Sequence, residues 1–207
     1  MVGIFGGTFD PVHYGHLRAA LEVKEIFGLD QVRLILSAQP PHRPAPQASA
    51  ACRLAMLTLA VQNQSGFIID TREIDRAGAS YTVLTLESLR LEFPNQALLL
   101  FIGTDAFEHL KAWYQWQRLF DLAHVVVLTR PGYQIGQLDA SFRERLTSRL
   151  SLLSERHAGI LFFQTITQLD ISASAIRLML GQGRSPRFLL PDAVLNYITA
   201  HKLYENV

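Results

Sequence analysis

Runs of consecutive apolar residues constrain the fold of this chain most. The run at 97–102 is apolar at nearly every position, and the runs at 125–128 and 160–163 resemble it. Strands of this composition are typical of a parallel sheet whose two faces are both covered by helices. Other segments show helical or strand patterns, and the two kinds alternate along the chain. The remaining predicted strands are 2–5, 32–36 and 67–70, and the predicted helices are 17–26, 50–61, 83–91 (after Ser80 as N-cap), 174–180 and 192–201.

Alternation of strands and helices predicts an α/β fold with a single doubly wound parallel sheet of the Rossmann-like kind. The length suits one domain, and no linker or internal repeat interrupts residues 1–207. Such sheets bind ligands beyond the carboxyl ends of their strands, where the strand order reverses. Polar residues suited to chemistry follow predicted strands at 6–16, 37–43, 103–105 and 171–177.

Composition excludes several classes of protein. The formal net charge is +1 at pH 7, so no broad basic surface for nucleic acid is expected. No run approaches the ~20 apolar residues of a membrane-spanning helix, and the N-terminus lacks a signal-peptide pattern. We therefore expect a cytoplasmic protein without membrane contact. Cys52 is the single cysteine, which excludes an internal disulfide, and its apolar neighbours predict an inert core thiol.

The segment Gly6–His16, with the sequence GGTFDPVHYGH, follows the first predicted strand directly. Its two leading glycines let the backbone approach a ligand closely. The start of the next helix offers unpaired N–H groups and partial positive charge, which favour a phosphate. His13 and His16 can face one side of that first turn and donate to phosphate oxygens. A metal pair or two surface histidines are the alternatives, although the spacing differs from that of a helical zinc pair.

Two segments together resemble the signatures of the nucleotidyltransferases that carry an HxGH motif: Gly6–His16 and Ile171–Arg177, which reads ISASAIR. Within that superfamily the chain resembles bacterial nicotinate-mononucleotide adenylyltransferase over nearly its whole length. The segments that carry this second resemblance are Pro40–Arg43, Ser80–Leu86, Ile102–Asp105, Trp113–Tyr114, and the C-terminal stretch from Leu190 to Tyr204.

The resemblance implies direct in-line attack of the acceptor's phosphate on the α-phosphorus of ATP, without a covalent enzyme intermediate. It makes His13, His16 and Arg177 the catalytic residues, with His16 nearest the α-phosphate. A surface ion pair is the alternative for Arg177, and an N-cap is the alternative for Ser174. The ATP contacts that it implies are Gly6, Gly7, Thr8, Phe9, His13, Gly15, His16, Gly103, Asp105, Ile171, Ser172, Ser174 and Arg177.

The resemblance also implies a site for nicotinate mononucleotide. Trp113 suits stacking on a pyridine ring, with core packing as the alternative. Backbone N–H donors at a helix start prefer a carboxylate to an amide, which favours nicotinate over nicotinamide. Asp105 is also interpretable as a turn residue, and the loop with His42 and Arg43 as a solvated one. The acceptor contacts that it implies are Ser37, His42, Arg43, Thr82, Thr85, Asp105, Trp113, Tyr114 and Arg130.

The expected partners are ATP and nicotinate mononucleotide, bound by a monomer or a homodimer. We expect Mg²⁺ as cofactor, held mainly by the ATP phosphates and water rather than by protein metal ligands. Alternative acceptors are phosphopantetheine and nicotinamide mononucleotide, and a non-enzymatic nucleotide sensor on the same fold also stays open. The loops at 38–48 and 104–116 are candidates for closure over substrate.

Three positions depart from the usual family pattern. Ala173 stands where a serine is usual, Arg43 where a lysine is commoner, and Leu36 where a proline is frequent. None of them removes His13, His16 or Arg177, so we expect them to change local affinity rather than the reaction. The other histidines, 109, 124, 157 and 201, have no motif partners and are interpreted as surface or packing residues.

Overall fold

The computed structural model describes residues 1–39, 44–76, 78–167 and 169–205. Its six strands form one parallel sheet in the order β3-β2-β1-β4-β5-β6, which confirms the predicted doubly wound α/β fold. The order reverses between β1 and β4, so the switch point lies where the HxGH segment leaves the sheet. The strands are β1 (Val2–Gly7), β2 (Val32–Leu36), β3 (Phe67–Asp70), β4 (Leu98–Gly103), β5 (His124–Thr129) and β6 (Leu161–Thr165).

The long helices lie where the apolar spacing predicts them, whereas the short ones had no sequence signal. A helix of three to seven residues has too few turns to show a period of about 3.6 residues. The long helices are α1 (Tyr14–Ile26), α2 (Ala50–Val61), α4 (Thr82–Glu92), α9 (Ala173–Gly181) and α10 (Asp192–Ala200). The short ones are α3 (Arg72–Asp75), α5 (Thr104–Glu108), the 3₁₀ turn η1 (Leu110–Ala112), α6 (Trp116–Leu122), α7 (Ala140–Arg143) and α8 (Leu152–Glu155).

Two hydrophobic cores cover the two faces of the sheet. In β4, Leu98, Leu100 and Ile102 belong to one core, and Leu99 and Phe101 belong to the other. The first core, the α4–α6 core, is closed by α4, α5, α6 and α7. The second, the α1–α2 core, is closed by α1, α2, α8 and α10. Because both faces are buried, β4 and β5 are apolar at consecutive positions, as the sequence predicts.

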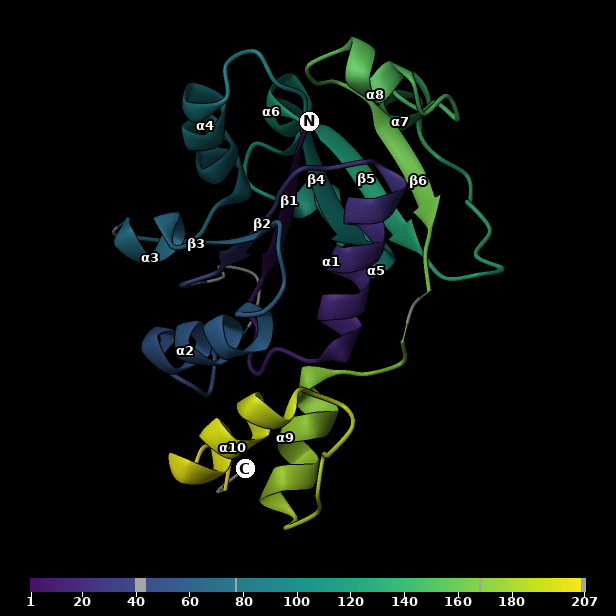
Figure 1. Cartoon of the computed structure of the whole chain (residues 1–207). Coiled ribbons are helices and arrows are strands. Elements are labelled where there is room, and N and C mark those ends of the chain that lie inside the picture. The colour runs from purple at the N-terminus through teal and green to yellow at the C-terminus, as the bar shows by residue number, and fades with distance from the viewer. Residues whose placement is uncertain (40–43, 77, 168, 206–207) are drawn as a thin grey trace.

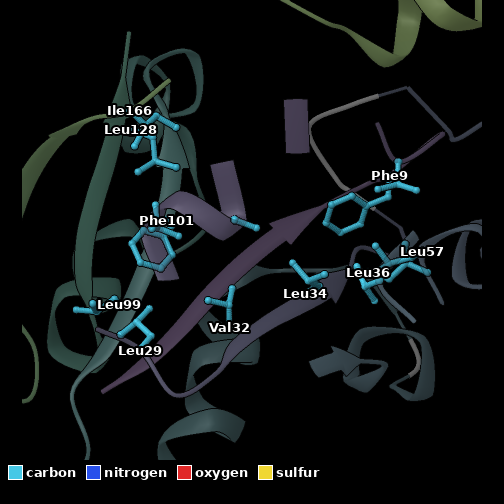
Figure 2. Packing of buried hydrophobic residues seen from close by; sticks show 14 of the residues in the cluster. Phe9, Leu29, Val32, Leu34, Leu36, Leu57, Leu99, Phe101, Leu128 and Ile166 are labelled. Carbon is cyan, nitrogen blue, oxygen red and sulfur yellow. The ribbon is translucent and has the colours of Figure 1, made fainter. Parts of the chain in front are cut away.

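Phe9 belongs to the α1–α2 core although it lies in the loop after β1. Its side chain is buried, and Figure 2 shows the ring beyond the end of β1, on the side of Leu36 and Leu57. The loop after β1 is therefore anchored in the core at its start. This anchoring limits how far the following residues of the HxGH segment can move.

The C-terminal helices lie at the carboxyl edge of the sheet. In Figure 1 the arrowheads of β5 and β6 point toward the end of the molecule that holds α9 and α10. Helix α10 also contacts α2, which follows β2. The carboxyl edge, where sheets of this kind bind ligands, is thus flanked by α9 and α10.

The predicted cap of α4, and the cap considered as an alternative for α9, differ from the observed ones. Tyr81, rather than Ser80, is the N-cap of α4, and the Ser80 hydroxyl accepts hydrogen bonds from the backbone N–H groups of Ala38 and Gln39. At α9 the N-cap is Ser172, whose hydroxyl accepts from the backbone N–H of Ala175, so α9 begins at Ala173. A serine near a helix start can cap the helix or bond another backbone group, and the sequence alone does not decide which of these it does.

Cys52 is half-buried and packs against the α1–α2 core, so the thiol that was predicted to lie in the core lies at its edge.

His124 is fully buried, and its ring bonds the Arg156 carbonyl and the Ile160 N–H, as expected for a packing residue. Among the described residues no helix is long and apolar enough to cross a membrane.

We expect truncation of Leu57 to lower the free energy of unfolding by about 2–5 kcal/mol, because Leu57→Ala leaves a cavity in a fully buried part of α2. The matched control is Leu91→Ala in α4, whose side chain is 85% exposed and should cost within about 0.5 kcal/mol. Urea denaturation of both variants measures the difference. Equal losses would contradict the assignment of the core.

Candidate functional site

His13 and His16 lie together at the start of α1. His13 is the N-cap, and the backbone N–H of His13 donates to Nδ1 of His16 at 3.4 Å. The two imidazole rings stack with centroids 3.7 Å apart and an interplanar angle of 28°. The predicted placement of both histidines on one side of the first turn is therefore what the structure shows.

Burial sets the charge of His13. Its side chain is almost completely buried, and desolvation lowers its pKa to about 4. Nδ1 is buried and has no hydrogen-bond partner among the described residues. His13 is therefore neutral at pH 7 and carries no fixed positive charge.

Gly15 makes room for the His13 ring. A Cβ on Gly15 would lie 3.0 Å from Cε1 and Nδ1 of His13, and 3.4 Å from the carbonyl oxygen of Ile171. The glycine therefore lets the His13 ring and the second signature pack against the same turn of α1. The two signatures, far apart in the sequence, are in contact here.

Phe9 supports His16 from the core. The rings of Phe9 and His16 meet edge to face, with centroids 5.1 Å apart. Phe9 is 1% exposed, so its side chain is a packing group, and a contact to ATP at this position would have to use the backbone. Thr8, just before it, is half-buried, and its carbonyl accepts a hydrogen bond from Arg53.

Asp10 is buried and accepts several hydrogen bonds from distant parts of the chain. Its carboxylate accepts from the backbone N–H groups of Gln47 and Ala48 and from the hydroxyl of Tyr204, at 2.8, 3.1 and 2.7 Å. Burial and the bond to Asp10 raise the pKa of Tyr204, so this hydroxyl keeps its proton and donates. The HxGH segment is thereby tied to the start of α2 and to the C-terminal segment.

Arg177 reaches the HxGH segment from α9. Its Nη1 donates to the Asp10 carbonyl at 2.7 Å and lies 3.8 Å from the Asp10 carboxylate. The side chain keeps 22% of its surface exposed, so part of the guanidinium stays open to a ligand. The hydroxyls of Ser172 and Ser174 lie 3.2 Å apart at the exposed start of the same helix. These hydroxyls, Arg177 and the two histidines all belong to the carboxyl edge of the sheet.

Arg53 is a residue of this site that the sequence analysis did not find. It is 1% exposed, and its guanidinium donates to four backbone carbonyls. Burial lowers its pKa, and the negative charge of Asp10 opposes that shift. Its signal in the sequence is an arginine in the helix 50–61, where Thr58 is the one other polar residue; the helical period places this arginine on the core face.

The predicted acceptor residues near β2, α4 and β4 have different surroundings. Ser37 follows β2, and its N–H donates to the Gly7 carbonyl. Thr82 is half-buried at the start of α4, whereas Thr85 is buried and its hydroxyl donates to Glu73 at 2.6 Å. Gly103 is the last residue of β4 and the N-cap of α5, and Asp105 lies in the first turn of α5. The Thr85 hydroxyl is thus committed to the protein interior.

The aromatic acceptor residues lie in the segment after η1. Trp113 is half-buried beside the α4–α6 core, and Tyr114 is 48% exposed with its ring centroid 4.7 Å from that of Tyr81. Arg130 is exposed directly after β5. His42 and Arg43 lie outside the described residues. No group of three or more His, Cys, Asp or Glu side chains among the described residues could hold a metal ion.

The family model and the relatives that match this chain agree with one another. The model of the cytidylyltransferase-like family matches residues 4–179. A protein of Methylococcus capsulatus named "probable nicotinate-nucleotide adenylyltransferase" is 50% identical, over 99% of both chains. One of Pseudomonas aeruginosa with the same name is 48% identical, over 98% of this chain and 96% of the other.

The chain belongs to the cytidylyltransferase-like family and, within it, to the nicotinate-nucleotide adenylyltransferases. A solved nicotinic acid mononucleotide adenylyltransferase of Plasmodium falciparum, complexed with NaAD, superposes with a TM-score of 0.75. The match spans all of this chain and 98% of the Plasmodium chain at 18% identity, so it shows that the two proteins share a fold. In this adenylyltransferase the HxGH segment and the second signature lie at the same edge of the sheet, where Arg177 bonds the Asp10 carbonyl.

The two adjacent glycines of the HxGH segment should respond differently to an added methyl group. A Cβ on Gly7 would lie 2.8 Å from the Phe9 ring, so we expect Gly7→Ala to cost about 1–3 kcal/mol of unfolding free energy. Apart from Gly6 itself and its two chain neighbours, no described atom lies within 4 Å of a Cβ on Gly6, so Gly6→Ala should change stability within about 0.5 kcal/mol. Thermal and urea unfolding compare the two. A Gly6→Ala loss as large as that of Gly7→Ala would contradict the packing of Phe9.

The buried His13 should make stability depend on pH. Its folded pKa of about 4 lies below the value of 6.5 for an unperturbed histidine, so the unfolded chain takes up the proton first as pH falls. Stability from this group is complete above pH 6.5 and is lost by up to about 3 kcal/mol as pH falls to 4. Urea unfolding across this range should show a smaller decline for His13→Gln than for wild type. Burial also lowers the pKa of His124, but both proteins contain this residue, so it contributes equally to the pH dependence of their stability.

Proposed function

We propose that this protein transfers the adenylyl group of ATP to nicotinate mononucleotide, forming nicotinate adenine dinucleotide and pyrophosphate in NAD biosynthesis. The observation that carries the proposal is the meeting of the two signatures at the Asp10 carbonyl, where Arg177 bonds the turn that leads to His13 and His16. Relatives that are named for this reaction are about half identical over nearly the full chain. We also propose that the protein acts in the cytoplasm as a monomer or a homodimer.

In the proposed reaction an oxygen of the acceptor's phosphate attacks the α-phosphorus of ATP. The new P–O bond forms as the bond from the α-phosphorus to the oxygen that bridges to the β-phosphorus breaks, and pyrophosphate leaves with that oxygen. No proton has to be taken from the acceptor, because its phosphate is already ionised. The protein therefore contributes position and charge stabilisation rather than acid–base chemistry.

Three groups would stabilise the charge that moves onto the leaving pyrophosphate. Arg177 offers the part of its guanidinium that Asp10 does not use, and Ser172 and Ser174 add hydroxyls at the start of α9. His16 would donate to the α-phosphate from the first turn of α1. His13, neutral in this structure, would donate one hydrogen bond, and bound phosphate would raise its pKa.

The acceptor would lie between the carboxyl ends of β1 and β4, toward α4. The side chain of Tyr81, the N-cap of α4, makes no capping hydrogen bond, so it does not use the first-turn N–H groups around Thr82. These N–H groups would favour a carboxylate, and half-buried Trp113 would stack on the pyridine ring. Thr85 would support this site from the interior, because its hydroxyl donates to Glu73 rather than to the acceptor.

Magnesium would enter with ATP. The described residues contain no cluster of ligating side chains, and the residues around the proposed phosphate site are hydroxyls, imidazoles and a guanidinium. This donor set fits phosphate oxygens, so the ion would be held by the phosphates and water, where it neutralises part of their charge.

Pyrophosphate release from ATP and Mg²⁺ tests the proposal, with nicotinate mononucleotide, nicotinamide mononucleotide and phosphopantetheine offered separately. We expect turnover with the nicotinate compound and a loss of about 10²–10³ in kcat for His16→Ala, because one phosphate donor is removed. The matched control is His157→Ala, an exposed histidine near the opposite edge, which should keep wild-type turnover. Turnover with another acceptor alone would overturn the acceptor, and no turnover with any would favour a nucleotide-binding regulator.

A further inference from the structure

Arg53 joins the ends of two neighbouring strands. Its Nη1 donates to the carbonyl of Thr8, after β1, and to that of Ser37, after β2, both at 2.7 Å. Nη2 donates to the Ala38 carbonyl at 3.2 Å, and Nε to the Ala48 carbonyl at 3.1 Å. All three guanidinium nitrogens are therefore used, and every acceptor is backbone.

The bonds of Arg53 begin where the sheet's own hydrogen bonds end. The last register pair of β1 and β2 is Gly7 with Leu36, and the last backbone bond between them runs from Ser37 N–H to the Gly7 carbonyl at 2.9 Å. Beyond this point Thr8 turns toward the HxGH helix and Ala38 leads into the loop before α2. Among the described residues, Arg53 alone bonds the carbonyls at both strand ends, and Asp10 joins the same two segments farther along, at the N–H groups of Gln47 and Ala48. Arg53 therefore sets the separation of the two segments just past the edge of the sheet.

The same two segments carry the two halves of the proposed site. Thr8 opens the turn that presents His13 and His16 to ATP phosphates, and Ser37 and Ala38 open the loop assigned to the acceptor. The Ser80 hydroxyl, just before α4, holds the N–H groups of Ala38 and Gln39 from the other side. A shift of about 1 Å between two reacting groups can cost on the order of a hundredfold in rate.

We propose that Arg53 is a positioning residue for adenylyl transfer, which fixes the distance between the ATP-phosphate turn and the acceptor loop without touching either substrate. This inference rests on the proposed function. It assigns the rate of the reaction, and not only the stability of the fold, to a side chain that is 1% exposed.

An arginine suits this task and a lysine does not. The guanidinium is planar and presents five donors in a fixed fork, so it can hold carbonyls of three segments at set angles. A lysine has one nitrogen on a flexible stem and reaches fewer of these carbonyls at once. Arg53→Lys therefore keeps the charge beside Asp10 while it releases the strand ends from each other.

Arg90 offers a matched control. It also donates to four backbone carbonyls, those of Phe93, Gln96, Leu122 and His157. These carbonyls precede β4, β5 and β6, so Arg90 ties the amino edge of the sheet as Arg53 ties the carboxyl edge. Arg90 has no assigned contact with the site, and Arg90→Lys should lower the melting temperature with little effect on turnover.

The test measures kcat, both KM values and melting temperature for Arg53→Lys, Arg53→Gln and Arg90→Lys with ATP and nicotinate mononucleotide, well below the melting temperatures. We expect kcat of the Arg53 variants to fall about tenfold to a hundredfold, with smaller changes in KM, because alignment in the transition state is lost. Arg90→Lys should keep kcat within about twofold.

An Arg53 variant that loses melting temperature as Arg90→Lys does, but keeps wild-type kcat, would overturn the inference and leave Arg53 a stabilising residue. Failure of both Arg53 variants to fold, where Arg90→Lys folds, would overturn it as well. Absence of turnover in the wild-type protein would instead reject the proposed function. The outcomes for the two proposals are therefore distinct.

Discussion

The buried carboxylate of Asp10 is the interaction on which the site depends. It accepts from two backbone N–H groups before α2 and from the hydroxyl of Tyr204, and it lies near both Arg53 and Arg177. A buried charge is costly unless its lone pairs are satisfied, and here the segment before α2 and Tyr204 supply three hydrogen bonds, while Arg177 of α9 lies 3.8 Å from the carboxylate. The first loop, helix α2, helix α9 and the C-terminal segment are thereby held to one point.

That constraint explains why the catalytic candidates need not be neighbours in sequence. His13 and His16 come from the first loop, and Arg177 comes from α9, more than a hundred residues later. Phe9 fixes the loop from the core side, and Asp10 fixes it from the side of the C-terminal helices. The imidazoles are held in a stacked pair, which restricts the freedom that would otherwise be lost when phosphates bind.

Much of the fold could be predicted because its signals are local. Consecutive apolar residues in β4 and β5 reveal a sheet covered on both faces, and the helices with several turns show their period. The short helices after β4 and around residues 140–155 gave no such signal. The site was predicted from motif residues, and the structure corrected local details, such as Tyr81 rather than Ser80 as the cap of α4.

By itself the sequence determined the α/β class, the strand-to-helix turn that suits a phosphate and the family, since each depends on residue types at fixed spacing. The tertiary structure alone decided which polar residues became internal supports. Asp10, Arg53 and Thr85 could each have faced solvent or a ligand, and only long-range packing buried them against distant backbone and side-chain partners. Burial and partners come from segments that are distant in sequence, so no local pattern records them.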